Sequence, residues 1–562
     1  MKTLTPQLRP ERQSPSITGR TTASEFDFLT VHVGKCSAMA GPRHGSVLLL
    51  VLVVVMMLSF SAYTFSELAI FDYQASVHIN RQIQTHELAV SGIDAAAELL
   101  ENSSHDQSMA DLAGVVIATT GSRVSRYTIL PEFPDNGTDV TFGLRDESSF
   151  LNINSLPLGP SKRMESRQRL TEIPGVTNEI ADAILDWMDA DDEPSQFGAE
   201  SSWYLTREQP YFPRQARFLH LEELLAVRGV TEQLFWGEDR NGNGLRDPQE
   251  VDANSDGQLQ RGLQNFLTVV AGERTVARNG RPKVNVNTNN LVELYDFLAS
   301  EFNQEIARFV AAWRMEGPVA TDGDPDQPLF DPAARRLERI ESAQRRLRQQ
   351  LNGSGSEIAR DVGERGGFSL SSAPPYQVRA LAELIGVTVR ITVNEKDTLL
   401  QSPWTSDANG FDIGLKQLET RLTTSDTQSV VGRINIIQAP AEVLRTVPGI
   451  APTLAQAIVS ARSRFDAGRS GRRHYPTIAW LLEDGLVTDT QLRRLAPYIT
   501  TEGDVHRGVS IGHVDGLDYA SAVRFQLDGT RSPIQLTAIQ HLPPLPVHHF
   551  PNLFHNNHKT RR

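Results

Sequence analysis

The sequence predicts an α+β protein in which a long N-terminal helix precedes helical modules and a strand-rich C-terminal segment. Two observations carry this prediction. Residues 46–66 contain no charged side chain, and apolar residues then recur at helical spacing to about Glu101, with no proline before Pro131. Farther along, two segments that begin at Leu151 and Ile434 share one pattern of short amphipathic helices separated by a proline-glycine turn.

The overall charge excludes some classes of function. The chain has 562 residues, with 68 acidic and 55 basic side chains and a formal net charge of −13. A general nucleic-acid binder needs a basic face to neutralise phosphates, so this balance argues against that class. Cys36 is the only cysteine of the sequence and precedes the apolar segment, which excludes an intramolecular disulfide. Packing or bound metal must therefore stabilise any exported part.

The apolar segment 46–66 is long enough to cross a bilayer, because about 20 helical residues span the ~30 Å hydrocarbon layer. Lys35 and Arg43 precede this segment and Glu67 follows it. That asymmetry predicts a cytoplasmic N-terminus and a bulk outside the membrane. A cleaved secretory signal is the alternative, with Ser59–Ala62 as a weak cleavage candidate.

The related segments predict duplicated modules. Those at Leu151 and Ile434 each begin with an Asn-Ile pair, continue with an apolar helix and a Pro-Gly turn, and end with a second helix. The motif VNVNTNN at Val284–Asn290 begins a further helix. Two short helices joined by a proline-glycine turn are typical of a helix-hairpin-helix unit.

Helix-hairpin-helix units often bind the DNA backbone, so a membrane-anchored receptor for DNA binding or uptake is the alternative function. The second copy is basic. The first copy is surrounded by acidic residues that would repel phosphates. These acidic residues are Glu179, Asp182, Asp186, Asp189, Asp191, Asp192 and Glu193. We therefore expect compact packing units and no nucleic-acid partner.

An acidic loop at residues 237–259 has the ligand order of an EF-hand. Gly244 stands at the sixth position, where the chain must turn sharply. The predicted ligands are Asp239, Asn241, Asn243, the carbonyl of Leu245, Asp247 and Glu250. A second, incomplete set would use Asp252, Asn254 and Asp256. The loop predicts bound calcium, which would close it in place of a disulfide, and an exposed acidic turn is the alternative.

Four ordered blocks carry a family resemblance. They are DWMDADDEP (Asp186–Pro194), GAESSWY (Gly198–Tyr204), PYFPRQARFLHLEELLAVRGVT (Pro210–Thr231) and VNVNTNN (Val284–Asn290). Together with the apolar helix they resemble the K-type minor pseudopilin of type II secretion systems. Most pilins carry a glutamate five residues into the mature chain. The K type resembles this chain in lacking it, since that position is Leu50 here.

The resemblance implies cleavage by a prepilin peptidase between Gly45 and Ser46. It implies a long helix against a pilin-like antiparallel sheet, a large inserted helical domain and calcium in that domain. The implied role is at the tip of a pseudopilus, assisting protein export across the outer membrane. The protein would be anchored once in the inner membrane with its bulk in the periplasm. I- and J-type minor pseudopilins and the secretion machinery would be its partners.

No enzyme signature is found in the sequence, which contains neither a phosphate loop nor a zinc-spaced Cys/His set, so no catalytic residue is predicted. The predicted organisation has seven parts. They are a leader (1–45), the helix (46–101), a pilin-like α/β part (102–160), a helical domain with the calcium loop (161–283), a second α/β region with an insertion (284–433), a second helix-hairpin-helix-like module (434–500), and a strand-rich end with a disordered tail (501–562).

Overall fold

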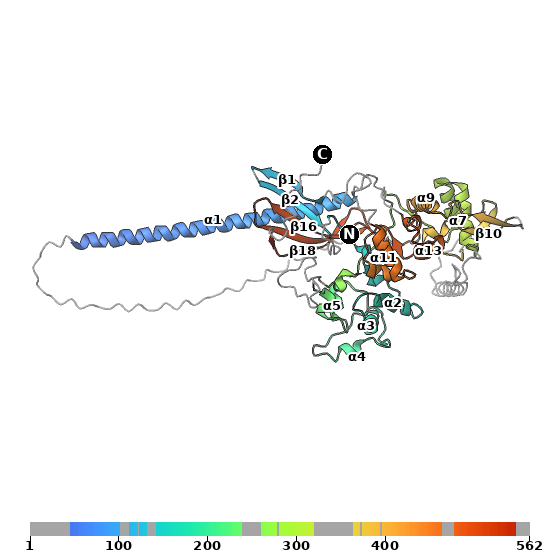
Figure 1. Cartoon of the computed structure of the whole chain (residues 1–562), viewed down its shortest axis with the longest axis horizontal. Helices are drawn as coiled ribbons and strands as arrows, with labels where there is room; N and C mark the ends of the chain where they lie inside the picture. Colours follow the sequence, from blue (N-terminus) through green and yellow to red (C-terminus); the bar gives the residue numbers. More distant parts are fainter. Residues whose placement is uncertain are drawn as a thin grey trace, which may run out of the picture. The chain divides into compact units, whose positions relative to one another are not determined.

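The computed structural model describes residues 45–101, 112–121, 123–131, 142–238, 260–277, 280–319, 363–370, 374–393, 396–462 and 477–546. The chain divides into two compact units, Met1–Val77 and His78–Arg562. Helix α1 (Gly45–Glu101) contributes to both (Figure 1). It contains an 18-residue window of mean hydropathy 2.5 with none of that window buried. By length and composition α1 can therefore cross a membrane, as the sequence predicts.

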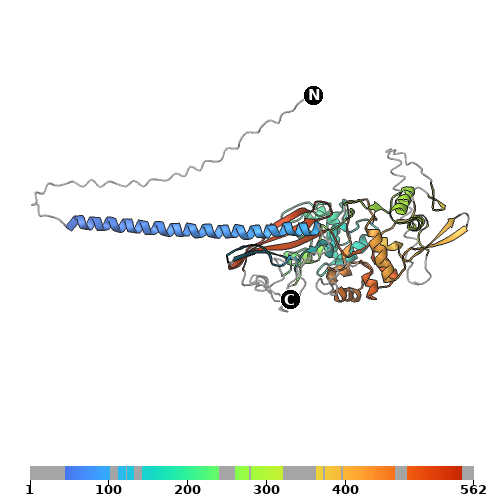
Figure 2. The same cartoon turned by 90° about the horizontal axis from the view of Figure 1, so that it is seen from above.

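The sheet of the second unit is antiparallel, and the end of α1 lies along it (Figures 1 and 2). The strand order is β1 (Val115–Thr120), β2 (Arg123–Leu130), β16 (Val505–Val514), β17 (Tyr519–Asp528) and β18 (Gln535–His541); β3 (Arg145–Asp146) pairs with β16 and β19 (Leu545–Pro546) with β17. Strand β2 pairs with β16 in a register that runs from Val509 opposite Leu130 to Val514 opposite Ser125. The sheet is thus completed by segments from both ends of the second unit.

Glycines allow α1 to approach this sheet closely. A Cβ atom on Gly512 would lie 2.0 Å from the carbonyl oxygen of Thr85, and one on Gly92 would lie 2.2 Å from the Oγ of Ser510. No side chain fits at such distances, so the helix rests almost directly on β16. A buried cluster fills the rest of the interface, including Ala89, Ile93, Ala96, Tyr127, Ile129, Val523 and Phe525.

Between β3 and β16 the described chain contains three modules of one design. Each opens and closes with a two-residue strand, and the two strands pair in parallel. The pairs are β4 (Leu151–Asn152) with β5 (Leu267–Thr268), β7 (Val284–Asn285) with β12 (Leu422–Thr423), and β14 (Ile434–Asn435) with β15 (Ile499–Thr500). One continuous apolar cluster runs through all three modules, so they share a core.

Each module contains short helices, several of which are visible in Figure 1, and the second module also contains short strands. The first module has η3 (Ile153–Ser155), α2 (Arg163–Thr171), α3 (Asn178–Met188), α4 (Ser201–Tyr204), η4 (Leu221–Ala226), α5 (Glu232–Trp236) and η5 (Leu263–Asn265). The second has α6 (Leu291–Glu301), α7 (Gln304–Glu316), β8 (Gly363–Arg365), β9 (Phe368–Leu370), η6 (Leu381–Leu384), β10 (Thr388–Val393), β11 (Lys396–Gln401) and α9 (Ala408–Glu419). The third has α10 (Ala441–Arg445), α11 (Pro452–Ala461), α12 (Trp480–Glu483) and α13 (Asp489–Leu495). The strands β6 (Glu273–Arg274) and β13 (Ser429–Val430) pair with each other, and η2 (Glu147–Ser149) follows β3.

An asparagine turn recurs at the start of each module. The Oδ1 of Asn152 accepts a hydrogen bond from the backbone N–H of Asn154 at 3.0 Å, and Asn285 accepts one from Asn287 at 2.8 Å. In the third module Asn435 accepts the equivalent bond from Ile437 at 2.8 Å. Such Asx turns end a strand sharply. The motif at Val284, from which the sequence predicts a further helix, therefore opens a full module, the second of the three.

Asp146 joins the two ends of this insertion. Its buried carboxylate accepts hydrogen bonds from the backbone N–H of Ser148 (2.8 Å), from the Nδ2 of Asn435 (2.7 Å) and from the N–H of Gly503 (2.6 Å). A Cβ on Gly503 would lie 2.5 Å from the Oδ1 of Asp146, so the carboxylate requires glycine there. The structure confirms the predicted α+β class, with a long apolar helix and an antiparallel sheet into which a helical region is inserted.

Candidate functional site

The predicted calcium loop lies outside the described residues. This applies to Asp239, Asn241, Asn243, Leu245, Asp247 and Glu250, and to Asp252, Asn254 and Asp256 of the incomplete second set. Gly45, at the predicted cleavage site, is the first residue of α1, and Ser46 follows it in the same helix. Calcium binding by this loop and cleavage at Gly45 therefore stay predictions.

The described structure places another acidic group in the first module, on helix α3. Thr177 caps this helix by accepting a hydrogen bond from the N–H of Ile180 at 3.4 Å. Asp182, Asp186 and Asp189 follow at intervals of four and three residues, so their side chains share one face of the helix. The side chains of Asp182 and Asp186 are fully buried.

Two arginines of α2 compensate part of this charge. Arg167 pairs with Asp182, with 2.6 Å between Nε and Oδ1. Arg163 donates to Asp186 and also to Asp189, with 2.6 Å between Nη1 and Oδ2 of Asp189. The arginines stand four residues apart, which matches the four-residue interval between Asp182 and Asp186 on the neighbouring helix. Partly buried ion pairs thus hold α2 against α3.

Glu200, just before α4, completes the acidic group. One oxygen of its carboxylate and one each from Asp186 and Asp189 all lie within 4.8 Å of one another. The residue is only 1 % exposed. Among the described residues, neither Oε atom of Glu200 has a hydrogen-bond partner, and the buried Oδ1 of Asp189 has none either. Three buried carboxylate oxygens therefore lack any donor, which is a costly arrangement.

Burial and like charge raise the pKa values in this group. Burial, followed by the charges of Asp186 and Asp189, raises the pKa of Glu200 to about 8 from its ordinary value of 4.5. Burial also raises the pKa of Asp186 and of Asp189, although Arg163 acts in the opposite direction on both. At neutral pH the group by itself favours a proton on Glu200.

The surrounding residues explain why the block GAESSWY has its composition. A Cβ on Gly198 would lie 1.8 Å from the Oδ2 of Asp186, so a larger residue would displace that carboxylate. The carbonyl of Gly198 accepts a hydrogen bond from the Nη1 of Arg228 at 2.9 Å. Tyr204 is fully buried, and its ring meets that of Trp187 edge to face at 5.4 Å. Glycine, glutamate and tyrosine therefore each have a separate structural role.

The sequence interpretation of these acidic residues was partly wrong. It treats all of them as charges around the hairpin that would repel phosphates. Asp182 and Asp186 are instead buried and paired with Arg167 and Arg163. Glu179 and the residues from Asp191 to Glu193 are exposed, as expected. The equal spacing of the arginines and aspartates could have indicated the pairing, but nothing in the sequence pointed to Glu200.

The basic residues of the third module are also engaged where they are described. Arg445 lies 3.8 Å from a carboxylate oxygen of Glu172, and Arg462 donates a hydrogen bond of 2.5 Å to the carbonyl of Ala439. Arg464, Arg469, Arg472 and Arg473 lie outside the described residues. The described part thus shows ion pairs and backbone contacts for these two arginines.

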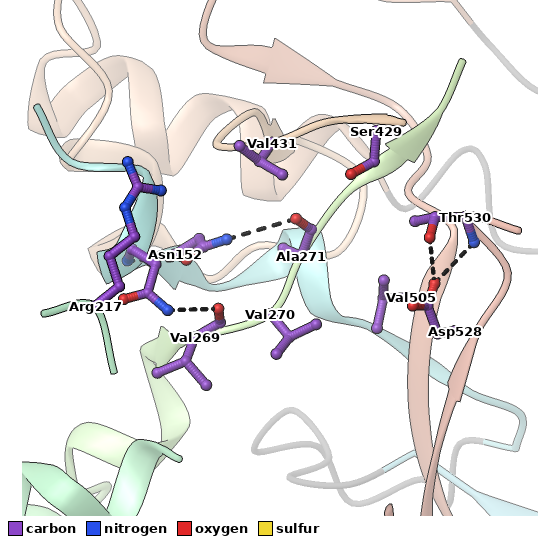
Figure 3. A pocket seen from close by; sticks show the side chains of 11 residues that line it. Asn152, Arg217, Val269, Val270, Ala271, Ser429, Val431, Val505, Asp528 and Thr530 are labelled. Atoms are coloured by element: carbon purple, nitrogen blue, oxygen red, sulfur yellow. Dashed lines mark hydrogen bonds between the residues drawn. The ribbon is translucent and has the colours of Figure 1, made fainter. Parts of the chain in front are cut away.

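A pocket of about 270 Å³ lies where the modules meet the sheet (Figure 3). Two of its polar side chains have partners: Asn152 donates to the carbonyl of Ala271 at 3.5 Å, and Asp528 accepts from the N–H of Thr530 at 2.9 Å. The rest of the lining is mainly apolar, with Val269, Val270, Val431 and Val505. This pocket lies at a junction between packed parts of the second unit.

Comparison with known proteins points to one family. Residues 149–236, which contain the acidic group, match the family described as type II secretion system (T2SS), protein K. A type II secretion system protein K from Pectobacterium carotovorum is 24 % identical over 211 residues, and one from Aeromonas hydrophila is 32 % identical over 120 residues. In this region the chain is similar to type II secretion system protein K.

The matches to these relatives are partial. The Pectobacterium alignment covers 35 % of this chain and 61 % of the relative, and the Aeromonas alignment covers 18 % and 36 %. The chain therefore spans about three fifths or less of the length of these relatives. A solved structure, the GspK-GspI-GspJ complex from enterotoxigenic Escherichia coli, is similar at a TM-score of 0.34 and 10 % identity, covering 84 % of this chain and 97 % of that one.

The acidic group makes stability depend on pH. Since the pKa of Glu200 is about 8 when folded and near 4.5 when unfolded, the folded chain holds an extra proton between these values. The free energy of unfolding in chelator should therefore fall by about 4 kcal/mol as the pH rises from 5 to 9. Glu200→Gln should flatten this slope and raise stability at pH 9. Denaturant melts of the detergent-solubilised chain measure both effects.

The exposed Glu179 provides the matched control, because Glu179→Gln should leave the slope unchanged. An equal slope in wild type and Glu200→Gln would contradict the raised pKa of Glu200.

Proposed function

We propose that this chain is a minor pseudopilin that caps the pseudopilus of a type II secretion system and so assists protein export across the outer membrane. The observation that carries the proposal is the protein K match over residues 149–236. The architecture supports it, because a long apolar helix packs on an antiparallel sheet as a pilin requires. The role is structural and involves no catalysis by the chain itself.

A position at the tip follows from two features. The insertion between β3 and β16 adds three modules to the sheet, and such bulk hinders the stacking of another subunit above. Leu50, five residues after the proposed cut, has no charge for the amino terminus of such a subunit. A chain of this kind ends a fibre and is present once in it.

The proposed partners are I- and J-type minor pseudopilins, the prepilin peptidase and the secretion machinery. The GspK of enterotoxigenic Escherichia coli was solved as a GspK-GspI-GspJ complex. The proposed location is the inner membrane, crossed once by α1, with the sheet and modules in the periplasm. The alternative role as a DNA receptor has no support among the comparisons.

Complex formation tests this function. The full chain, co-expressed with the I- and J-type pseudopilins of its own organism and purified through a tag, should yield an equimolar ternary complex by size exclusion and mass spectrometry. Deleting the gene should stop secretion of proteins that depend on the system. If the chain instead polymerises alone into long fibres, the tip assignment is wrong.

Maturation is the next prediction. A prepilin peptidase should cut after Gly45 and leave Ser46 as the N-terminus. N-terminal mass spectrometry of the membrane-extracted protein checks this, and Gly45→Leu should block the cut. The control, Gly41→Leu, should be processed normally. An N-terminus near Tyr63 would indicate a secretory signal instead, and an intact leader would also contradict the pilin assignment.

The loop at residues 239–250 is proposed to bind calcium, with Glu250 as the bidentate ligand. Binding to the native state alone stabilises it by about 2.7 kcal/mol when calcium is present at a hundredfold excess over Kd. Glu250→Gln should remove most of this gain, measured as the difference in melting temperature between calcium and chelator. Asp252→Asn should remove less of it, since the second ligand set is incomplete. An unchanged gain in Glu250→Gln would exclude the loop as a site.

A further inference from the structure

A second pocket lies where the second half of α1 meets two hairpins of the sheet. Its volume is about 420 Å³, and ligand pockets are typically roughly 300–1,000 Å³ in size. The lining comes from three parts of the second unit. They are Arg81 and Gln84 of α1, Thr120, Gly121, Arg123 and Ser125 of the β1–β2 hairpin, and Val514 and Leu517 of the β16–β17 hairpin. Polar side chains therefore make up most of this pocket.

The charged side chains of the pocket are two arginines. Arg81 is half-buried and Arg123 is exposed, and in the part of the chain that the structure describes neither guanidinium forms an ion pair. Among the described residues that line the pocket, none is acidic. Asp515 and Asp518 of the neighbouring turn do not line it, and Asp515 already pairs with Arg126 at 3.1 Å. The pocket thus has two positive charges in a chain whose formal net charge is −13.

Neutral hydrogen-bonding groups lie beside the two arginines. Ser125 is only 5 % exposed, and its Oγ accepts a hydrogen bond from the Nε2 of Gln84 at 3.3 Å. This bond leaves the hydroxyl hydrogen of Ser125 and the second amide hydrogen of Gln84 able to donate. Thr120, which pairs with Arg123 across the β1–β2 turn, adds another hydroxyl. Hydrogen-bond donors and positive charge together are what an oxyanion requires.

We propose that this pocket binds a phosphate group, with Arg81 and Arg123 as its charged ligands. A guanidinium presents a planar fork of N–H donors that matches the spacing of phosphate oxygens. A phosphate monoester carries about −1.5 to −2 charges near pH 7, so it neutralises both arginines. A carboxylate carries one charge and two oxygens, and would leave one arginine without a partner. The site shares no residue with the acidic group or with the loop at 239–250.

Calorimetry tests the proposal. The full chain, solubilised in a maltoside detergent, which contains no phosphate, is titrated with sodium phosphate at pH 7.5 and constant ionic strength. We expect one phosphate to bind per chain. Arg81→Gln and Arg123→Gln should each raise Kd at least tenfold, because each variant removes charge-assisted hydrogen bonds. Acetate should bind at least tenfold more weakly than phosphate, since it has a single charge.

Arg390→Gln is the matched control, because this exposed arginine lies on β10 and outside the pocket. It should leave Kd unchanged. Melting temperatures measured without phosphate should be the same in all variants, which separates loss of binding from loss of fold. The proposal is overturned if the wild-type chain binds no phosphate, if Arg81→Gln or Arg123→Gln leaves Kd unchanged, or if acetate binds as tightly as phosphate.

A further titration identifies the source of the phosphate group. Glycerophosphoglycerol, the soluble headgroup of phosphatidylglycerol, is a phosphodiester with one charge, so we expect it to bind more weakly than inorganic phosphate. Tighter binding of this headgroup would identify a phospholipid as the source, and tighter binding of inorganic phosphate would identify a phosphate in solution. None of these measurements involves I- or J-type pseudopilins, so failure of this proposal and failure of the proposed function are distinguishable.

Discussion

The fold depends on one buried carboxylate, that of Asp146. The sheet is built from segments before and after the insertion, and β16 can pair with β2 and β3 only if the insertion returns to its starting point. Asp146 fixes that return, because it accepts hydrogen bonds from Asn435 of the third module and from Gly503 at the start of the last strands. Its own N–H donates to the side chain of Gln438 at 2.9 Å. A single side chain thus connects the sheet, the third module and the chain's return, at a site that is only 2 % exposed.

Within each module, side-chain hydrogen bonds likewise hold together segments that are distant in the sequence. Each is closed by a parallel pair of two-residue strands, which have too few hydrogen bonds to be stable alone. The asparagine after the first strand adds side-chain bonds: Asn154 donates to the carbonyls of Phe218 and Val269 at 2.9 and 3.0 Å, and Asn287 donates to those of Val378 and Thr424 at 2.8 and 2.9 Å. In the third module Ile437 replaces this asparagine, and Asp146 supplies the polar contact to Asn435 instead. The first module differs by adding the acidic group, within the region shared with protein K relatives.

The sequence predicted the parts whose signal is periodic or repeated. Helix α1 and the related modules at Leu151 and Ile434 follow from apolar spacing and a recurring motif, both of which are local. The sheet was expected only from the family resemblance. Its register joins Leu130 to Val509, and strand partners so far apart in the sequence leave no periodic pattern. Only part of the candidate site could be predicted from the sequence. The run of acidic residues was evident in the sequence. The burial of Asp186, however, depends on Arg163 from another helix and on the space that Gly198 leaves by having no side chain. The sequence did not indicate that Glu200 joins the acidic group, since burial of a lone glutamate cannot be inferred from its neighbours.

Hydrogen exchange of the full chain tests most directly whether Asp146 unites the sheet with its insertion. In Asp146→Asn the carboxylate that accepts from Asn435 and Gly503 is replaced by an amide, which weakens the charge-assisted bonds and turns one acceptor into a donor. We expect amide protection to fall together in β2, β16, β14 and β15, because these strands are held through the one junction. Protection lost only next to the mutation, in β3 and η2, with β14, β15 and β16 unchanged, would contradict it.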